Sequence, residues 1–143
     1  MSIQRLYTAT AKATGGRDGR ATSSDNVIDL PLSTPKEMGG PGKAGATNPE
    51  QLFAAGYAAC FDGALNLVAR LEKTPISGST IEAAVSFGKD GDNYGLAVDM
   101  AVNIPGLSQE QAEALVAKAH QVCPYSRATR GNIEVNLSTT TNA

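Results

Sequence analysis

The stretch that decides the fold is TNPEQLFAAGYAACFDGALNLVARLEK, residues 47–73. It predicts one long helix, because Asn48 can cap the start, Pro49 is preorganised for the first helical position and Gln51 can complete a capping box. The predicted end is at Lys73, since a cation suits the negative end of a helix and the following Thr-Pro pair cannot continue the pattern. A single helix of this length organises the rest of the chain.

One face of this helix carries mostly small residues at spacings of three and four. Its members are Leu52, Ala55, Gly56, Ala59, Cys60, Gly63, Ala64, Leu67 and Leu71. Small side chains let another backbone approach, so we expect this face to pack closely against another element and to leave Cys60 buried or half-buried. Such a face also favours a dimer formed around the helix, although packing on the chain's own sheet remains open.

Length and composition limit the functional classes. A chain of 143 residues with 41% hydrophobic content is expected to form one domain over 1–143. The net charge of −2 argues against a nucleic-acid partner, which needs a basic face. We find no apolar run of membrane-spanning length and no signal-peptide core at the N-terminus, so we expect a cytoplasmic protein that does not bind membranes.

The remaining pattern predicts strands over 6–14, 20–23, 27–32, 80–88, 94–104 and 133–137. Residues 33–47 read as a loop that can cover a site, since six of its fifteen residues are Gly or Pro. Ser108 and Gln111 form a capping box that starts a second helix, and Pro124 ends it just after Cys123. Adjacent strands joined by tight turns indicate an α+β fold, with antiparallel sheets packed on the long central helix.

Two glycine-rich motifs resemble nucleotide-binding motifs but do not indicate a nucleotide site. GPGKAG at 40–45 matches the dinucleotide fingerprint in letters, but it lies in mid-loop without a parallel βαβ unit around it. The Gly-Lys pair inside it is no phosphate loop either, because Ala44 stands where Ser or Thr is required. We therefore expect no bound nucleotide cofactor.

The two cysteines are candidates for catalysis, redox sensing or metal binding, because structural disulfides are rare in a reducing compartment. Cys60 lies in mid-helix, where burial alone would make it an inert small hydrophobe, so a reactive thiolate there needs a cation nearby. Cys123 lies at a helix end, where a thiol is placed to move. A zinc site with His120, the one histidine, lacks a CxxC pair or a second His, and we expect no metal.

Three motifs together carry a resemblance: NPEQL at 48–52, AACF at 58–61 and VCPYS at 122–126. They resemble the organic hydroperoxide resistance proteins, a branch of the superfamily that contains the osmotically inducible protein C. The similarity extends from GGRDG at 15–19 to TRGN at 129–132 and so covers nearly the whole chain.

The resemblance implies a thiol peroxidase that reduces organic hydroperoxides, including fatty-acid hydroperoxides, to alcohols. It implies that Cys60 attacks the peroxide and becomes a sulfenic acid, that Cys123 resolves it as a disulfide, and that Arg17 and Glu50 complete the site. It further implies an intertwined homodimer with two active sites, re-reduced by dihydrolipoyl groups on a lipoylated protein, with no cofactor bound.

The residue chemistry agrees with these roles. Arg17, in a Gly-rich turn, can favour the Cys60 thiolate, and Glu50 can orient its guanidinium by a bidentate pair. Glu50 lies about 15 Å along the helix from Cys60, so either Arg17 spans the gap or Glu50 arrives from a partner helix, which we favour. An apolar substrate pocket is expected, with walls at Met38, Leu52, Phe53 and Phe61.

Two rival classes stay open at this point. A redox sensor would oxidise once and alter a partner interaction, and a ligand-binding or structural dimer would carry inert cysteines. Turnover with a reductant separates an enzyme from both.

Overall fold

The computed structural model describes residues 2–143, which fall into two compact units. The first unit runs to Pro49 and the second covers Glu50–Ala143. The expectation of a single domain over 1–143 stays a prediction.

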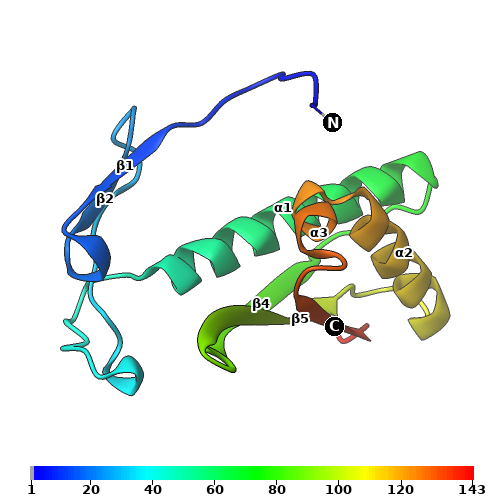
Figure 1. Ribbon diagram of the computed structural model, residues 1–143. Helices are drawn as coiled ribbons and strands as arrows, with labels where there is room; N and C mark the ends of the chain where they lie inside the picture. Colours follow the sequence, from blue (N-terminus) through cyan, green and yellow to red (C-terminus); the bar gives the residue numbers. More distant parts are fainter. Residues whose placement is uncertain (1) are drawn as a thin grey trace. The chain divides into compact units, whose positions relative to one another are not determined.

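The first unit is a small antiparallel sheet with two short 3-10 helices (Figure 1). Its elements are β1 (Ala11–Thr14), η1 (Gly16–Asp18), β2 (Arg20–Ser23), β3 (Asp29–Pro31) and η2 (Lys36–Met38). The strand predicted over 6–14 begins only at Ala11, because β2 pairs with β1 from Ala11 onward, and Leu6 and Tyr7 are 90% and 85% exposed. Among the described residues of this unit, only Leu32 and Ser33 are buried.

The second unit contains three helices and a three-stranded sheet. The elements are α1 (Pro49–Leu71), β4 (Thr80–Asp90), β5 (Asn93–Asn103), α2 (Gln109–Val122), α3 (Pro124–Thr129) and β6 (Glu134–Thr140). The hairpin of β4 and β5 is antiparallel, as predicted, and closes through a turn at Gly91 and Asp92. In contrast, β6 runs parallel to β5, because the helical connection through α2 and α3 returns the chain in the same direction.

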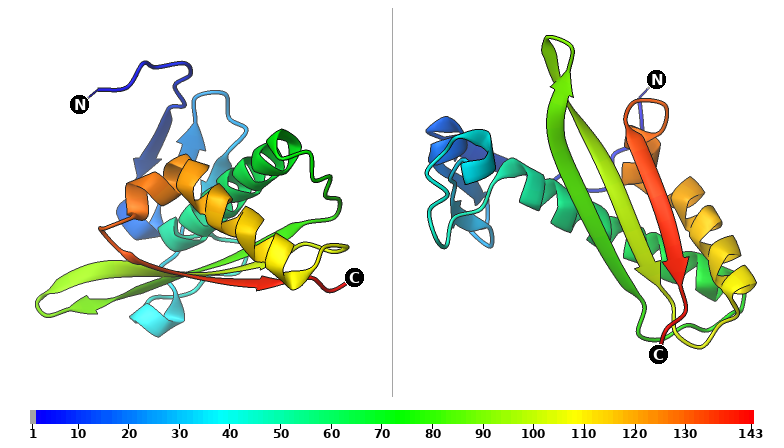
Figure 2. Two further views of the ribbon diagram at one scale, coloured as in Figure 1. Left: turned by 90° about the vertical axis from the view of Figure 1, so that its right-hand side faces the viewer. Right: turned by 90° about the horizontal axis from the view of Figure 1, so that it is seen from below.

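Both long helices lie on one face of this sheet (Figure 2). Strand residues alternate between partly buried and exposed, so the other face is polar and open, with Glu82, Asp99 and Asn136 on it. The α+β class predicted from the sequence is therefore confirmed, with a mixed rather than purely antiparallel second sheet.

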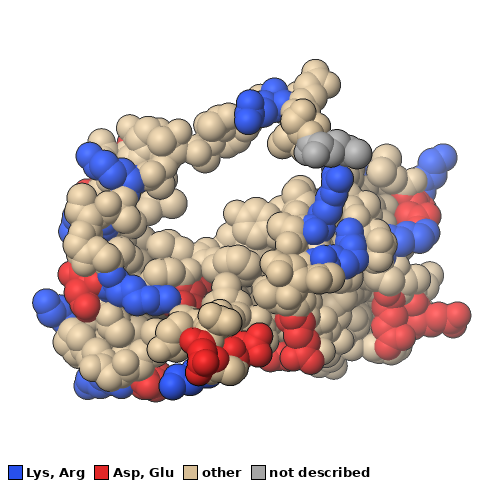
Figure 3. Space-filling view, viewed as in Figure 1, with Lys and Arg blue, Asp and Glu red and all other residues tan. Residues whose placement is uncertain are grey.

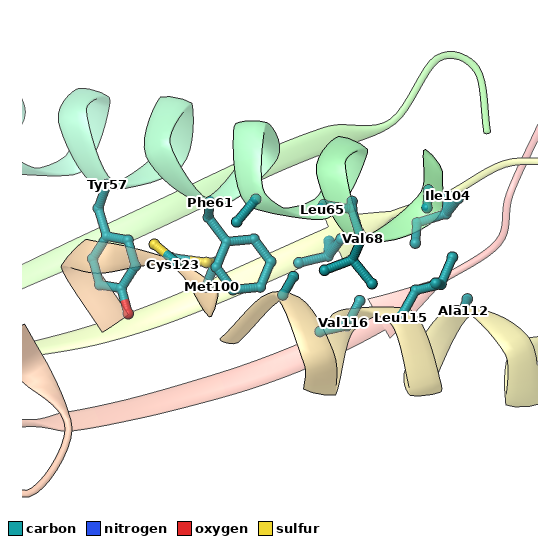
Figure 4. Packing of buried hydrophobic residues seen from close by; sticks show 14 of the residues in the cluster. Tyr57, Phe61, Leu65, Val68, Met100, Ile104, Ala112, Leu115, Val116 and Cys123 are labelled. Carbon is teal, nitrogen blue, oxygen red and sulfur yellow. The ribbon is translucent and has the colours of Figure 1, made fainter. Parts of the chain in front are cut away.

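The core lies between α1, α2 and the sheet, and Figure 4 shows it from close by. From α1 it receives Tyr57, Phe61, Ala64, Leu65, Val68 and Ala69, and from α2 Ala112, Leu115, Val116 and Ala119.

The prediction of which face of α1 is packed is only partly right. Ala55, Ala59 and Gly63 are exposed, and Leu71 is 72% exposed. The chain instead buries the stripe that removes the largest apolar area from water, led by Tyr57 and Phe61. The second unit therefore leaves Ala55, Ala59 and Gly63 of the small-residue stripe exposed, whereas Gly56 and Ala64 pack within it. Cys60 is half-buried as expected.

The helix ends mostly follow the predicted signals. Helix α1 begins at Pro49 and ends at Leu71, and Lys73 then takes a left-handed conformation while Thr74 N–H bonds back to Ala69 O. The Ser108–Gln111 capping box of α2 is present in full. Helix α3 was not predicted, since Pro124 was interpreted only as a terminator, whereas it also occupies the first position of a new helix.

Helix α1 also corrects the expectation that no apolar run has membrane-spanning length. Its 23 residues and its hydropathy of 1.4 would allow it to cross a membrane by length and composition alone. Six of its side chains are buried in the unit's core. Buried core helices also meet these criteria of length and composition, so they are weak evidence for a membrane span.

On the face shown in Figure 3, basic side chains are interspersed with acidic ones.

Candidate active site

The two cysteines lie together in the second unit. Cys123 Sγ is 3.6 Å from Cys60 Sγ and donates a hydrogen bond to it, although 63 positions separate the residues in the chain. Both are free thiols; Cys60 is half-buried and Cys123 fully buried. A thiol pair at this distance needs only a small shift to form a disulfide, whose sulfur atoms lie about 2.05 Å apart.

Cys123 is placed by the junction of two helices. It ends α2 and is also the residue before α3, with an extended backbone (φ −61°, ψ 123°) that the following proline favours. Its N–H bonds to Ala119 O, and its carbonyl accepts from Arg127 N–H. Figure 4 shows its side chain at the end of the core where Tyr57 and Phe61 lie.

The surroundings of Cys60 within the second unit disfavour its charged form. Burial raises the pKa of the Cys60 thiol, and the nearby Cys123 adds to the rise. A hydrogen bond from the backbone N–H of Tyr125 acts in the opposite direction and lowers this pKa. Because the thiolate is the nucleophile, this site needs a further donor or cation to react near neutral pH.

Arg17, the predicted cation, lies in η1 of the first unit and is half-buried. The turn around it is built by glycine: Gly15 and Gly16 have φ of 73° and 60°, and a Cβ on Gly19 would lie 1.7 Å from Thr14 O. Asp18 accepts hydrogen bonds from the backbone N–H and hydroxyl of Thr34, which lower its pKa and tie the turn to the following loop. The local structure thus presents Arg17 from a defined turn, and its approach to Cys60 stays a prediction.

Glu50 is the second residue of α1 and is half-buried. Ten residues separate it from Cys60 on a continuous helix, so it does not reach the sulfur along its own helix. Its pairing with Arg17 likewise stays a prediction.

Three aromatic rings form a cluster in the second unit. Phe53, Tyr57 and Tyr125 have ring centroids 5.9 to 6.4 Å apart, in edge-on or tilted geometry. Gly56 makes room for this cluster, since a Cβ there would lie 3.2 Å from Tyr125 Oη. Tyr57 and Tyr125 were not singled out from the sequence, although one lies a turn before Cys60 and the other lies within VCPYS.

The predicted pocket walls are placed differently from one another. Leu52 and Phe53 are half-buried in the first turns of α1, and Phe53 contacts the aromatic cluster. Phe61 is fully buried in the core, where none of its ring is open to a ligand. Met38 lies at the end of η2 in the first unit and is half-buried.

A chain of hydrogen-bonded polar side chains, which was not predicted from the sequence, links the three helices of the second unit. Tyr57 Oη is 2.8 Å from Ser126 Oγ and 3.3 Å from Thr129 Oγ1, and Ser126 Oγ is 2.8 Å from His120 Nδ1. Tyr57 and Ser126 are 0% exposed. His120 thus belongs to this hydrogen-bonded chain, and burial, followed by the charge of Arg130, lowers the pKa of its imidazole. Within residues 2–143 no group of three His, Cys, Asp or Glu side chains is arranged to hold a metal ion.

Comparison with known proteins agrees with the motifs. The sequence profile of the OsmC-like protein family matches residues 40–138. The organic hydroperoxide resistance protein of Xanthomonas axonopodis pv. citri is 54% identical over 134 residues, which are 93% of this chain and 94% of the relative.

Solved structures show the same fold. The organic hydroperoxide resistance protein of Legionella pneumophila has a TM-score of 0.90 and 47% identity, covering 97% of this chain and 100% of that one. A Vibrio cholerae protein described as a putative organic hydroperoxide resistance protein, with captopril bound in one of its active sites, has a TM-score of 0.90 and 45% identity, covering 100% and 97%. From the motifs, the fold and these likenesses together, the chain belongs to the OsmC-like protein family, in its organic hydroperoxide resistance branch.

Proposed function

We propose that this chain is a cysteine-based peroxidase that reduces organic hydroperoxides, including fatty-acid hydroperoxides, to alcohols. The observation that carries the proposal is the thiol pair, with a half-buried Cys60 at 3.6 Å from a buried Cys123. One thiol is partly open to a substrate and the other is shielded from it, which suits an attacking and a resolving cysteine.

The reaction balances in three steps. The Cys60 thiolate attacks the terminal peroxide oxygen, the O–O bond breaks, and the alkoxide takes a proton and leaves as the alcohol while Cys60 becomes a sulfenic acid. The Cys123 thiol condenses with this sulfenic acid, releasing water and forming the disulfide. An external dithiol then supplies two electrons and two protons by exchange, restoring both thiols.

Arg17 and Glu50 have supporting roles in this proposal. The pKa of Cys60 is raised by burial in the second unit, so a reactive thiolate calls for a cation. We assign that cation to Arg17, which also holds the leaving oxygen, and we assign the orientation of Arg17 to Glu50.

The proposed substrate site is apolar. Leu52, Phe53 and Met38 are half-buried and offer walls for an organic group, and Tyr125, with its ring over Gly56, extends them. Hydrogen peroxide has no apolar part to bury, so the organic substrate gains binding energy that hydrogen peroxide cannot.

We also propose that the protein works as an intertwined homodimer. Ala55, Ala59 and Gly63 of the small-residue stripe are exposed on the second unit, and the first unit buries few of its described residues. The Vibrio cholerae relative has more than one active site, as its description of captopril in one of them states. A second copy would cover the stripe and can deliver Glu50 to the site of its partner.

The proposed reductant is a dihydrolipoyl group on a lipoylated protein, in the cytoplasm, and no bound cofactor is required. A disulfide between Cys60 and Cys123 would be reopened by thiol–disulfide exchange with such a dithiol.

The test is consumption of cumene hydroperoxide or hydrogen peroxide with dihydrolipoamide, for the wild type and Cys60→Ser. Rapid turnover on the organic substrate, lost in the variant, supports the proposal. A single fast oxidation without turnover with dihydrolipoamide and with several other dithiols identifies a redox sensor. Oxidation of Cys60 no faster than that of a free thiol would contradict the proposed function.

A further inference from the structure

The buried polar chain of Tyr57, Ser126 and His120 connects three helices at the cysteine pair. Tyr57 lies on α1 one turn before Cys60, Ser126 lies on α3, and His120 lies in the last turn of α2. The two contacts at Ser126 Oγ are both 2.8 Å long, which is typical of well-formed hydrogen bonds. Cys123 and Tyr125 lie between His120 and Ser126, so the hydrogen bonds of these two residues hold the segment 123–125 at both ends.

Few local interactions stabilise this segment. Helix α3 has six residues and no side-chain hydrogen bond at its N-cap. A helix this short is not stable by itself, so its position depends on tertiary contacts. Arg130 Nη1 donates to His120 O, and Thr129 Oγ1 donates to Ser126 O, which close the segment back on α2 and on itself.

Ser126 is the central residue of the hydrogen-bonded chain, because its hydroxyl contacts both Tyr57 and His120. Its hydroxyl has one hydrogen and two lone pairs, so it can donate to one of Tyr57 and His120 while accepting from the other. Thr129 uses its own hydrogen on Ser126 O, which leaves its oxygen free to accept from Tyr57. Only one direction then supplies a hydrogen to every contact: His120 Nδ1–H donates to Ser126 Oγ, Ser126 donates to Tyr57 Oη, and Tyr57 donates to Thr129 Oγ1. This direction requires the Ser126 hydroxyl.

We propose that Tyr57, Ser126 and His120 are positioning residues that hold the Cys123–Tyr125 segment against Cys60. This inference rests on the proposed function. The segment supplies the Tyr125 N–H, which bonds to Cys60 Sγ, and the Cys123 thiol at 3.6 Å. The chain thus serves both steps at Cys60: it stabilises the attacking thiolate through Tyr125, and it keeps Cys123 within reach for the condensation that forms the disulfide and releases water.

The first measurement follows the pH dependence of Cys60 alkylation by iodoacetamide, in a Cys123→Ser background where Cys60 is the only thiol. Ser126→Ala is expected to move the midpoint upward by roughly half a unit to one unit, which lowers the rate at pH 7 about three- to tenfold. Tyr57→Phe and His120→Ala each remove one of the two contacts and are expected to give smaller shifts. His120→Asn, whose amide can replace Nδ1, is expected to restore the wild-type midpoint.

The second measurement uses the two-cysteine protein with an excess of cumene hydroperoxide and no reductant. Ser126→Ala is expected to form the Cys60–Cys123 disulfide several-fold more slowly and to accumulate more sulfinic acid, because a sulfenic acid that waits is oxidised further. Ser79→Ala is the matched control, since it removes a 2.9 Å hydroxyl contact to Asp62 on the same helix α1 without touching the segment.

The inference is overturned if Ser126→Ala and His120→Ala match Ser79→Ala in both measurements. If Ser126→Ala does not fold, Tyr57→Phe and His120→Ala decide the outcome. The two proposals can be tested separately, because alkylation of Cys60 needs no peroxidase activity. A wild-type protein without turnover would contradict the proposed function. The alkylation series would still test whether Tyr57, Ser126 and His120 position the segment.

Discussion

Cys123 Sγ donates a hydrogen bond to Cys60 Sγ across 3.6 Å, although the two residues come from different helices and from distant parts of the chain. The contact places a buried thiol directly behind a half-buried one. In the proposed mechanism, a substrate would therefore reach Cys60 first, and Cys123 would react only after the Cys60 sulfenic acid had formed.

Replacing the buried thiol separates the two steps. Cys123→Ser is expected to consume one equivalent of cumene hydroperoxide at close to the wild-type rate and then to stop, because Cys60 sulfenic acid has no thiol to condense with. Trapping with dimedone, followed by mass spectrometry, detects the sulfenic acid. Full turnover in this variant would show that an external thiol resolves Cys60 directly.

Removing the proposed cation tests the electrostatics. Arg17→Ala is expected to raise the pKa of Cys60, because burial already pushes it upward and no guanidinium then opposes that effect. The thiolate fraction at pH 7 falls about tenfold for each unit of the rise, and the alkylation rate with it. Arg20→Ala is the control, since Arg20 in the same unit pairs with Asp29 on the surface. Equal rates in the two variants would contradict the role of Arg17.

The proposed apolar pocket leads to a prediction about substrate choice. Phe53→Ala is expected to raise KM for cumene hydroperoxide by roughly 10- to 100-fold, the equivalent of losing one buried aromatic contact. Its rate with hydrogen peroxide should change little, because that substrate has no apolar group. Steady-state kinetics with both peroxides check this, and a parallel loss on both would indicate damage to the site as a whole.

The small-residue stripe of α1 leads to a prediction about the proposed dimer. A Cβ at Gly63 meets nothing within 4 Å in the chain itself, so Gly63→Ala alone would stabilise the helix by about 0.5–1 kcal/mol. If a second copy packs closely on the stripe, the same change weakens the dimer, which is the result we expect. Sedimentation velocity over a concentration series measures it. A more stable protein with unchanged association would argue against this interface.

His120 predicts a pH dependence of stability. Its pKa in the folded state is lowered, first by burial and then by Arg130, so the unfolded chain binds a proton more readily. The resulting stability is present above about pH 6.5, the ordinary value for histidine, and is lost as the pH falls through the lower folded value. Urea midpoints from pH 7.5 to 5 should therefore fall more steeply for the wild type than for His120→Asn. Parallel curves would contradict this.

Local signals in the sequence predicted the elements well. The capping box of Ser108 and Gln111 was predicted and is present, and the β4–β5 hairpin follows its turn residues. These features depend on neighbours along the chain, which a sequence displays directly. The extent of β1 was missed because the length of a strand depends on its partner: β2 pairs with β1 only from Ala11 onward.

What the sequence by itself determined are the long helix, the α+β class, the family and the two cysteines that the motifs point to. Only the tertiary structure decided that Tyr57 and Phe61, rather than the small residues, enter the core, that β6 runs parallel to β5, and that Tyr57, Ser126 and His120 form one buried chain. The physical reason is that burial and hydrogen bonding between distant residues depend on how helices and strands pack, and spacing along one helix does not reveal which of its faces will find a partner.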